Sequence, residues 1–183
     1  MTKIEVRISG LGGQGVVLAG QVLGRAVVYD GKNAVQTQSY GAEARGSMAK
    51  SDVIISDGRI GYPAVRKLDV LIAMNQGAVD KYIRDLKDDG TLIVDSTNVG
   101  RIPETEANIV RIPATEDAEK TFGEKIYANM LILGVLATMT CIVGESAIEK
   151  AIEDTVTEKV ASVNKHAFRR GKELAKSENS AAS

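Results

Sequence analysis

A glycine-rich segment near the N-terminus has the residue types and spacing to bind a phosphate group. The segment reads Gly10-Leu11-Gly12-Gly13-Gln14-Gly15. Gly10, Gly12 and Gly15 match the G-x-G-x-x-G spacing, whose glycines make a tight turn, admit a phosphate to the backbone and allow close packing of helix and strand. A helix that begins after Gly15 would direct its free amides and positive dipole end at an anion. A purely steric role in a β–α turn would require the same glycines.

The residues around this segment disfavour two common nucleotide chemistries. A P-loop that hydrolyses ATP or GTP needs Lys-Ser or Lys-Thr after its last glycine, whereas two valines follow Gly15. An NAD site needs an acidic residue about 20 positions on, at the end of the second strand. The predicted second strand, 33–38, ends without an acid, and Asp30 precedes it in a turn.

The chain has too few ligands for a metal cluster and no convincing catalytic triad. It contains one cysteine, Cys141, and one histidine, His166. Iron–sulfur clusters and structural zinc sites need several thiolate or imidazole ligands. Cys141 lies in an apolar stretch and is expected to be a small buried side chain, whereas His166 lies in a charged helical pattern and is expected at the surface. The sequence therefore predicts no catalytic residue and no metal site in this chain.

Length and composition favour one domain. The 183 residues are 44% hydrophobic and carry a net charge of −1, which predicts a single domain over 1–176 and a disordered tail over 177–183. Positive residues are interspersed with acids, so nucleic acid is not an expected partner. The longest apolar stretch, 130–143, is too short to span a bilayer, and the N-terminus resembles a strand instead of a signal peptide. We therefore expect a cytoplasmic protein without a membrane partner.

The elements that position the glycine segment alternate between strand and helix. Strands are predicted at 3–8, 33–38, 51–56, 70–74, 92–95 and 109–112. This order predicts an α/β fold, a three-layer Rossmann-like domain with a mainly parallel sheet. Ligands of such folds bind at the carboxyl ends of the strands, which here include Gly10 and Asn75.

The last third of the chain is predicted to be helical. The helices are expected at 127–143, from a capping box to about 155, and from about 157 onward. The first is apolar on nearly all sides and should lie between the sheet and another layer or a partner chain. Gly144 is expected to end it, and Ser146 with Glu149 forms the predicted capping box of the second.

A second motif gives the chain a resemblance to a known family. It reads Gln38-Ser39-Tyr40-Gly41-Ala42-Glu43-Ala44-Arg45-Gly46. Together with the glycine segment, it closely resembles the gamma subunit of 2-oxoacid:ferredoxin oxidoreductases over essentially the whole chain. This form of the motif is similar to that of the 2-oxoglutarate branch, the 2-oxoglutarate synthases, whereas the pyruvate branch usually has a Phe-rich segment. The family commonly continues with a second glycine, at whose place this chain has Ser47.

The resemblance implies a complex that converts a 2-oxoacid, coenzyme A and oxidised ferredoxin into an acyl-CoA, carbon dioxide and reduced ferredoxin. Thiamine diphosphate, magnesium and iron–sulfur clusters would be held by partner subunits of alpha, beta and delta type, and ferredoxin would be met through the complex. The present chain would be a subunit of that enzyme, not catalytic alone, and would contribute to coenzyme A binding and to assembly.

The resemblance and the glycine segment together predict a contact with coenzyme A. The backbone amides of the segment would meet the pyrophosphate, and Arg45 would add a charge-assisted contact. The predicted cofactor-binding residues are Gly10, Gly12, Gly13, Gln14, Gly15, Gln38, Ser39, Tyr40, Arg45 and Asn75.

Two other functions stay open at this point. One is a free-standing nucleotide-binding protein, and the other is a purely structural subunit, which the apolar helix at 127–143 favours equally. Branched-chain 2-oxoacids, pyruvate and indolepyruvate are alternative substrates, because substrate selection would lie mainly in other chains. Buried apolar helices are also compatible with a homodimer of the isolated chain.

Overall fold

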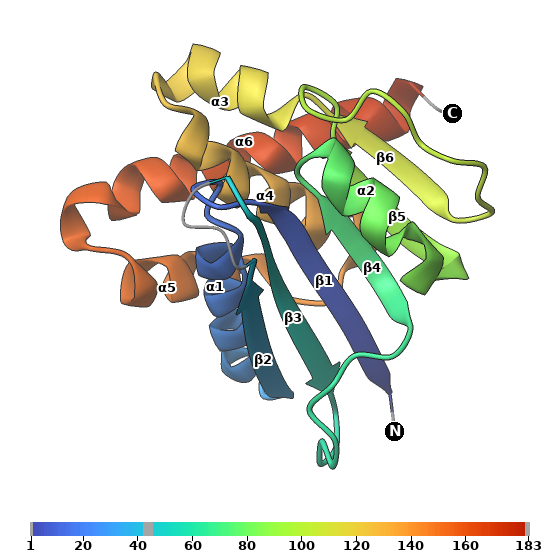
Figure 1. The fold of residues 1–183 in the computed structure, drawn as a ribbon. Helices are drawn as coiled ribbons and strands as arrows, with labels where there is room; N and C mark the ends of the chain where they lie inside the picture. The colour runs from blue at the N-terminus through green and yellow to red at the C-terminus, as the bar shows by residue number, and fades with distance from the viewer. Residues whose placement is uncertain (1, 42–45, 182–183) are drawn as a thin grey trace.

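The computed structural model describes residues 2–41 and 46–181, which form one six-stranded sheet with helices on both faces (Figure 1). The strands are β1 (Lys3–Leu11), β2 (Asn33–Tyr40), β3 (Met48–Ser56), β4 (Leu68–Ala73), β5 (Leu86–Asp95) and β6 (Asn108–Ile112). The helices are α1 (Val16–Tyr29), α2 (Gln76–Tyr82), α3 (Ala114–Phe122), α4 (Ala128–Thr140), α5 (Glu145–Thr155) and α6 (Glu158–Ala181), with short 3-10 turns η1 (Ile83–Asp85) and η2 (Lys125–Tyr127). All six predicted strands are confirmed, and most are longer than predicted.

The sheet is mixed, with strand order β2-β3-β1-β4-β5-β6. β1, β4, β5 and β6 are parallel neighbours, whereas β3 is antiparallel to both β1 and β2. The connection 41–47 is too short for a crossover, so β3 returns beside β2 as the second strand of a hairpin. The mainly parallel sheet is thus confirmed, but β3 separates the carboxyl end of β2 from the end of β1.

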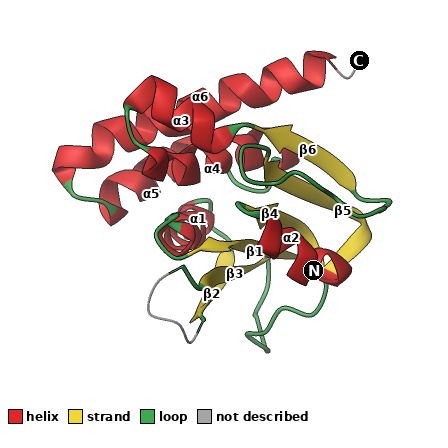
Figure 2. Cartoon of the chain, turned by 45° about the horizontal axis from the view of Figure 1, so that its top comes forward, coloured by secondary structure: helices red, strands yellow, loops and turns green. Residues whose placement is uncertain are grey.

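The helices complete the three layers predicted from the sequence (Figure 2). The helices α1 and α3 to α6 cover one face, where Val6 and Ile8 of β1 join Leu133 of α4 in the larger core cluster. The helix α2 packs on the other face, where Val79 joins Leu71 and Leu92.

The polar side of β1 is buried as well as its apolar side. The Arg7 side chain is only 6% exposed and donates Nε to Asp52 Oδ1 at 2.6 Å and Nη2 to Asp52 Oδ2 at 2.9 Å. Its Nη1 donates to Asp85 Oδ2 at 2.8 Å, and its guanidinium lies 4.6 Å from the ring centroid of Tyr82. These contacts join β1, β3 and the end of α2, since a buried charge needs paired acceptors.

Three local predictions in the helical third are wrong. α4 ends at Thr140 instead of at Gly144, because Cys141 takes the left-handed conformation (φ 52°) at its C-cap. This turn directs Cys141 to the surface, so the residue is exposed and not buried. The predicted capping box is absent, since Gly144 is the N-cap of α5 and Ser146 lies inside the helix. The backbone amide of Gly144 donates to the carboxylate of Asp30 instead.

The last helix, α6, is longer than the sequence pattern suggests. It continues to Ala181 and includes most of the segment for which the sequence predicts disorder, while residues 182–183 lie outside the described residues. His166 lies on its exposed side, as predicted.

α4 and α6 cross with their backbones in contact at two glycines. A Cβ atom on Gly134 would lie 2.0 Å from the carbonyl oxygen of Phe168. A Cβ atom on Gly171 would lie 1.8 Å from the carbonyl oxygen of Leu131. Neither backbone can move away without separating the buried faces of the two helices, so only glycine fits at this crossing.

The substitution Gly171→Ala should therefore destabilise the protein by about 3 kcal/mol, because the added methyl group overlaps backbone instead of a movable side chain. Urea unfolding followed by circular dichroism measures this loss. The control is Gly100→Ala, whose Cβ would meet nothing within 4 Å and which should leave stability unchanged within about 1 kcal/mol. Equal midpoints for Gly171→Ala and the wild type would contradict the close crossing.

Candidate functional site

The glycine segment forms the connection between β1 and α1, as predicted. Gly13 has φ 94° and Gly15, the N-cap of α1, has φ 73°. Both angles lie in the left-handed region that favours glycine. No side chain caps α1, and its first turn contains no acidic residue. Among the described residues, its first-turn amides therefore have no side-chain acceptor, at a place where the helix dipole favours an anion.

Gln14 fixes this loop to the end of β4. Its side-chain Nε2 donates to the carbonyl oxygen of Met74 at 3.1 Å, and its Oε1 accepts from the Leu11 amide at 2.6 Å. A Cβ atom on Gly10 would lie 2.4 Å from Gln14 Oε1 and 3.0 Å from Met74 Cβ. Gly10 thus makes room for the Gln14 side chain, whose polar atoms bind the protein itself.

Gly15 is required by α4 as well as by its own backbone angle. A Cβ atom there would lie 2.3 Å from Asn129 Nδ2 and 3.3 Å from Ile126 Cδ1. Asn129 is buried at the start of α4 and donates Nδ2 to the carbonyl oxygen of Gly15 at 3.3 Å. Gly15, the third glycine of the motif, therefore lets the start of α4 pack against the loop.

Gly12 differs from the other glycines of the motif. Its φ is not left-handed, and the nearest atom to a Cβ placed on it is the carbonyl oxygen of Ser47, at 3.6 Å. Its amide donates to that same oxygen at 2.9 Å. None of the described residues excludes a side chain at Gly12, so residues 2–41 and 46–181 do not account for a steric need for glycine there.

An apolar hollow of about 270 Å³ lies beside the loop. It is lined by Leu11, Gly12, Gly13, Gly15, Val16, Val17, Tyr40, Ala49 and Ile126. Tyr40, Ala49 and Gly10 lie in one row across β2, β3 and β1. Ala49 and Gly10 have small or no side chains. The Tyr40 ring on β2, which is 60% exposed, therefore borders the hollow although β3 lies between β2 and the loop.

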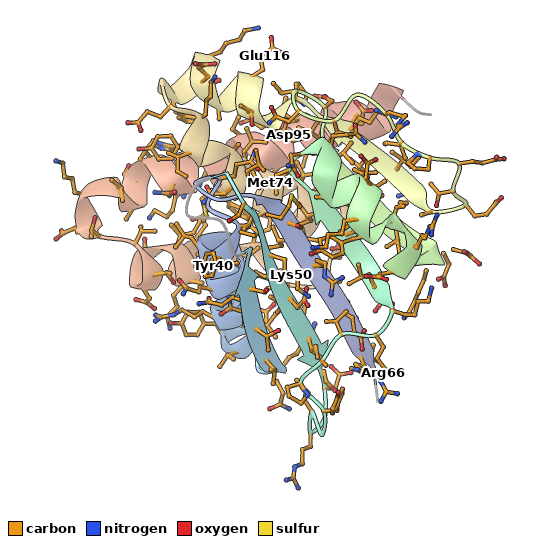
Figure 3. The ribbon with its side chains drawn as sticks, viewed as in Figure 1. Tyr40, Lys50, Arg66, Met74, Asp95 and Glu116 are labelled. Atoms are coloured by element: carbon orange, nitrogen blue, oxygen red, sulfur yellow. The ribbon has the colours of Figure 1, made fainter. Side chains whose placement is uncertain are left out.

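A second crevice of about 320 Å³ lies on the other side of the loop. It is lined by Gly13, Gln14, Met74, Thr97, Asn98, Thr115, Glu116, Glu119, Lys125 and Ile126. In Figure 3, Met74 and Glu116 of this lining, together with Asp95, are labelled in the upper half of the view. The loop separates the hollow from the crevice, since Gly13 and Ile126 line both.

A buried carboxylate organises the floor of the crevice. Asp95, at the end of β5, accepts from the amide of Thr97, from Asn98 Nδ2 at 3.0 Å and from Thr115 Oγ1 at 2.5 Å. These bonds satisfy the carboxylate and join the end of β5 to the start of α3. Asp95 is therefore a structural group.

The wall formed by α3 is acidic and firmly held. Asp117 accepts from Arg170 Nε at 3.0 Å and from Nη2 at 2.8 Å, which joins α3 to α6. The hydrogen bond with Asp117 raises the pKa of Arg170 above its ordinary value, so the guanidinium stays charged. Glu116 and Glu119 line the crevice with one cation, Lys125, which lies 3.7 Å from Glu119. Glu116 is in turn paired with Lys120, whereas the described residues that line the hollow include no charged side chain.

The remaining predicted site residues take different positions. Asn75 is the N-cap of α2, and its Oδ1 accepts from the Ala78 amide at 3.0 Å. Gln38 and Ser39 are exposed on β2 but line neither the hollow nor the crevice, because β3 lies between β2 and the loop. Arg45 lies outside the described residues. The carbonyl oxygen of Ser47, two residues further along the chain, accepts from the Gly12 amide.

Sequence reasoning missed two residues that shape the site, Ile126 and Asn129. Ile126 precedes the apolar helix and Asn129 lies in its first turn, and both are more than a hundred residues from the loop in sequence. Asn129 had a usable signal, since it is the one polar side chain in the run 128–137.

In the ranges 2–41 and 46–181, no three His, Cys, Asp or Glu side chains are grouped so that they could hold a metal ion. None of the helices described is long and apolar enough to cross a membrane.

Comparisons with known proteins agree on one family. Residues 5–174 match the profile described as pyruvate ferredoxin/flavodoxin oxidoreductase. The 2-oxoglutarate synthase subunit KorC of Methanocaldococcus jannaschii is 46% identical over 94% of both chains. The gamma subunit of a keto/oxoacid ferredoxin oxidoreductase from Geobacter sulfurreducens superposes with a TM-score of 0.85 at 42% identity, over 95% of this chain and 99% of that one.

The same fold is also found within a longer chain. The 2-oxoglutarate:ferredoxin oxidoreductase of Magnetococcus marinus, with 2-oxoglutarate, coenzyme A and succinyl-CoA bound, matches with a TM-score of 0.86 at 23% identity. The match covers 97% of this chain and 32% of that chain, so the same fold occurs there as part of a larger polypeptide.

The role of Gln14 can be tested by Gln14→Glu, which replaces the donor to the Met74 carbonyl with an acceptor of the same shape. Two facing oxygens and a lost hydrogen bond should lower the free energy of unfolding by about 1–3 kcal/mol. Urea unfolding measures the change. The matched control, Gln21→Glu at an exposed position of α1, should stay within about 0.5 kcal/mol of the wild type. A Gln14→Glu protein as stable as this control would show that the two hydrogen bonds do not hold the loop.

Proposed function

The chain belongs to the pyruvate ferredoxin/flavodoxin oxidoreductase family, and we propose that it is the gamma subunit of a 2-oxoglutarate:ferredoxin oxidoreductase. The complex would oxidatively decarboxylate 2-oxoglutarate with coenzyme A to succinyl-CoA and carbon dioxide, and two electrons would pass to ferredoxin. The 46% identity to a 2-oxoglutarate synthase subunit, over 94% of both chains, supports this branch of the family.

The redox cofactors would belong to partner subunits of alpha, beta and delta type. A four-iron cluster needs several cysteine thiolates, and this chain has one cysteine. Thiamine diphosphate supplies the carbanion chemistry of such enzymes and needs a magnesium site of its own. The residues of this chain fit neither group, so its contribution would be to bind and position.

The glycine loop is the part of this chain that fits coenzyme A. The uncapped first turn of α1 offers amides to a pyrophosphate, and Gly12 leaves space for a phosphate to approach. The hollow beside Tyr40, whose described lining has no carboxylate, would accept the phosphates of the ligand more readily than the crevice, which Glu116 and Glu119 line. Arg45 would supply the counter-charge. The space at Gly12 is the observation that carries this proposal.

A purely structural role is the second candidate, and one observation favours it. Leu11, Tyr40 and Ile126 form an exposed apolar rim around the hollow. Exposed apolar groups gathered around a hollow are typical of a protein interface as well as of a ligand site. In this case the loop would dock on a thiamine-binding subunit without touching coenzyme A.

The overall activity is tested by co-expressing this chain with the other subunits under anaerobic conditions. We expect coenzyme A-dependent reduction of a viologen dye, fastest with 2-oxoglutarate and slower with pyruvate, 2-oxoisovalerate and indolepyruvate. Faster reduction with another of these acids would move the assignment to a different branch. A chain that purifies alone and supports no such activity would favour a free-standing nucleotide-binding protein.

The coenzyme A contact is tested by Gly12→Ala in the assembled complex. The methyl group should not disturb the fold but should obstruct the phosphate, and the KM for coenzyme A should rise about tenfold, which corresponds to about 1.4 kcal/mol. Arg45→Ala should raise the same KM by a similar factor through the lost charge-assisted contact. Steady-state kinetics at saturating 2-oxoglutarate measure both effects, with Gly100→Ala as the control.

The same variants separate binding from assembly. If Gly12→Ala and Arg45→Ala reduce co-elution of the subunits in gel filtration, while the complex that still forms has an unchanged KM for coenzyme A, the loop is an interface and the structural candidate is correct. A normal complex with an unchanged KM would contradict both roles.

A further inference from the structure

Asn129 is a buried amide in the first turn of an otherwise apolar stretch of helix. Only 1% of its surface is exposed, and every other residue of the run 128–137 is apolar or glycine. A buried amide loses its hydrogen bonds with water and needs protein partners in their place, a demand that an apolar side chain would not make. The partners of Asn129 therefore decide what it contributes.

Both ends of this amide are bonded, and the two partners fix which end faces the glycine loop. The Asn129 Oδ1 accepts from the Met130 amide at 2.7 Å, and Nδ2 donates to the carbonyl oxygen of Gly15 at 3.3 Å. The reverse orientation would place donor against donor at one end and acceptor against acceptor at the other. The donor of the side chain is therefore directed at the loop.

The Gly15 carbonyl connects this bond to the amides at the start of α1. It also accepts from the Ala19 amide at 3.0 Å, in the first hydrogen bond of the helix. The Gly15 carbonyl and the Val16 amide belong to one planar peptide group and point in opposite directions. Two donors on the carbonyl therefore fix the direction of the Val16 amide, and both residues line the hollow.

A glycine at the start of a helix needs such a restraint. Gly15 has φ 73°, and glycine loses more conformational freedom than any other residue when its backbone is held. None of the described side chains caps α1, so the Asn129 bond comes from a different helix, α4. A site whose donors are held in place before binding has a higher affinity than one that must order them on binding.

We propose that Asn129 is a positioning residue for the phosphates of coenzyme A. It acts through Gly15 instead of touching the ligand, and it holds the Gly15–Val16 peptide group so that the Val16 amide is ready to meet a phosphate. The inference rests on the proposed contact between the glycine loop and coenzyme A, to which it adds a residue of α4. An anchor that served the fold alone would leave the affinity of an assembled complex unchanged, whereas a positioning residue must change it.

The test is Asn129→Leu in the assembled complex, because leucine has nearly the shape of asparagine but cannot donate a hydrogen bond. The KM for coenzyme A should rise about fivefold through the lost hydrogen bond. The kcat and the KM for 2-oxoglutarate should stay unchanged, because partner subunits would hold the reacting groups. Asn129→Asp is the second variant. It keeps an acceptor for the Met130 amide but turns another acceptor toward the Gly15 carbonyl, so it should raise the KM for coenzyme A at least as much.

The matched control is Ile132→Val on the same helix. Ile132 is fully buried and lines neither the hollow nor the crevice, and the substitution removes one methylene group from the core. It should loosen the packing of α4 but leave the KM for coenzyme A within about twofold of the wild type. Gel filtration verifies that each variant assembles with the other subunits.

The kinetics separate this inference from the proposed function. A higher KM for coenzyme A in the Asn129 variants, with an unchanged control, would establish the positioning role. An unchanged KM in these variants, while Gly12→Ala raises it, would overturn the inference and leave the proposed contact intact. An unchanged KM in all of them would overturn both. A KM that rises equally in the control, or Asn129 variants that fail to assemble, would show that Asn129 serves the packing of α4 alone and would also overturn the inference.

Discussion

The position of α4 is the constraint on which the rest of the structure depends. Its first turn presses on the glycine loop at Gly15, where Asn129 binds the loop carbonyl, and its middle meets the backbone of α6 through Gly134 and Gly171. Three glycines in distant parts of the sequence thus let one buried helix touch both the candidate site and the outer layer. Because the helix is buried along nearly its whole length, it cannot shift without moving the loop.

The sequence predicted the elements better than their contacts. All six strands and the helical C-terminal third follow from hydrophobic periodicity, which is a local property. The insertion of β3 between β1 and β2 follows from the short connection 41–47, whose hairpin separates the end of β2 from the loop. Arg7 alternates with apolar residues along β1, yet it is buried, because Asp52 on β3 and Asp85 beyond α2 supply its partners.

The candidate site was only partly predictable, because it too depends on contacts between residues that are distant in sequence. The motif predicts a tight turn at the glycine segment, whereas the contacts that exclude a side chain at Gly10 and Gly15 come from Gln14, Met74 and Asn129. Asn75, which is predicted to bind the cofactor at a strand end, caps α2, a role that asparagine performs with the same side-chain oxygen. Residue type and strand-end position do not separate these roles, because both need a hydrogen-bond acceptor at the start of a helix.

Because the glycine loop borders both the hollow and the crevice, a change on one side of it can affect binding on the other. Gly13 and Ile126 contribute to both walls, so a molecule that moves the loop on one side changes the shape of the other. Binding on the two sides would then be thermodynamically linked, and each occupant would change the affinity for the other by the same factor. The subunit would in this way couple the binding of a ligand to the binding of a neighbouring chain.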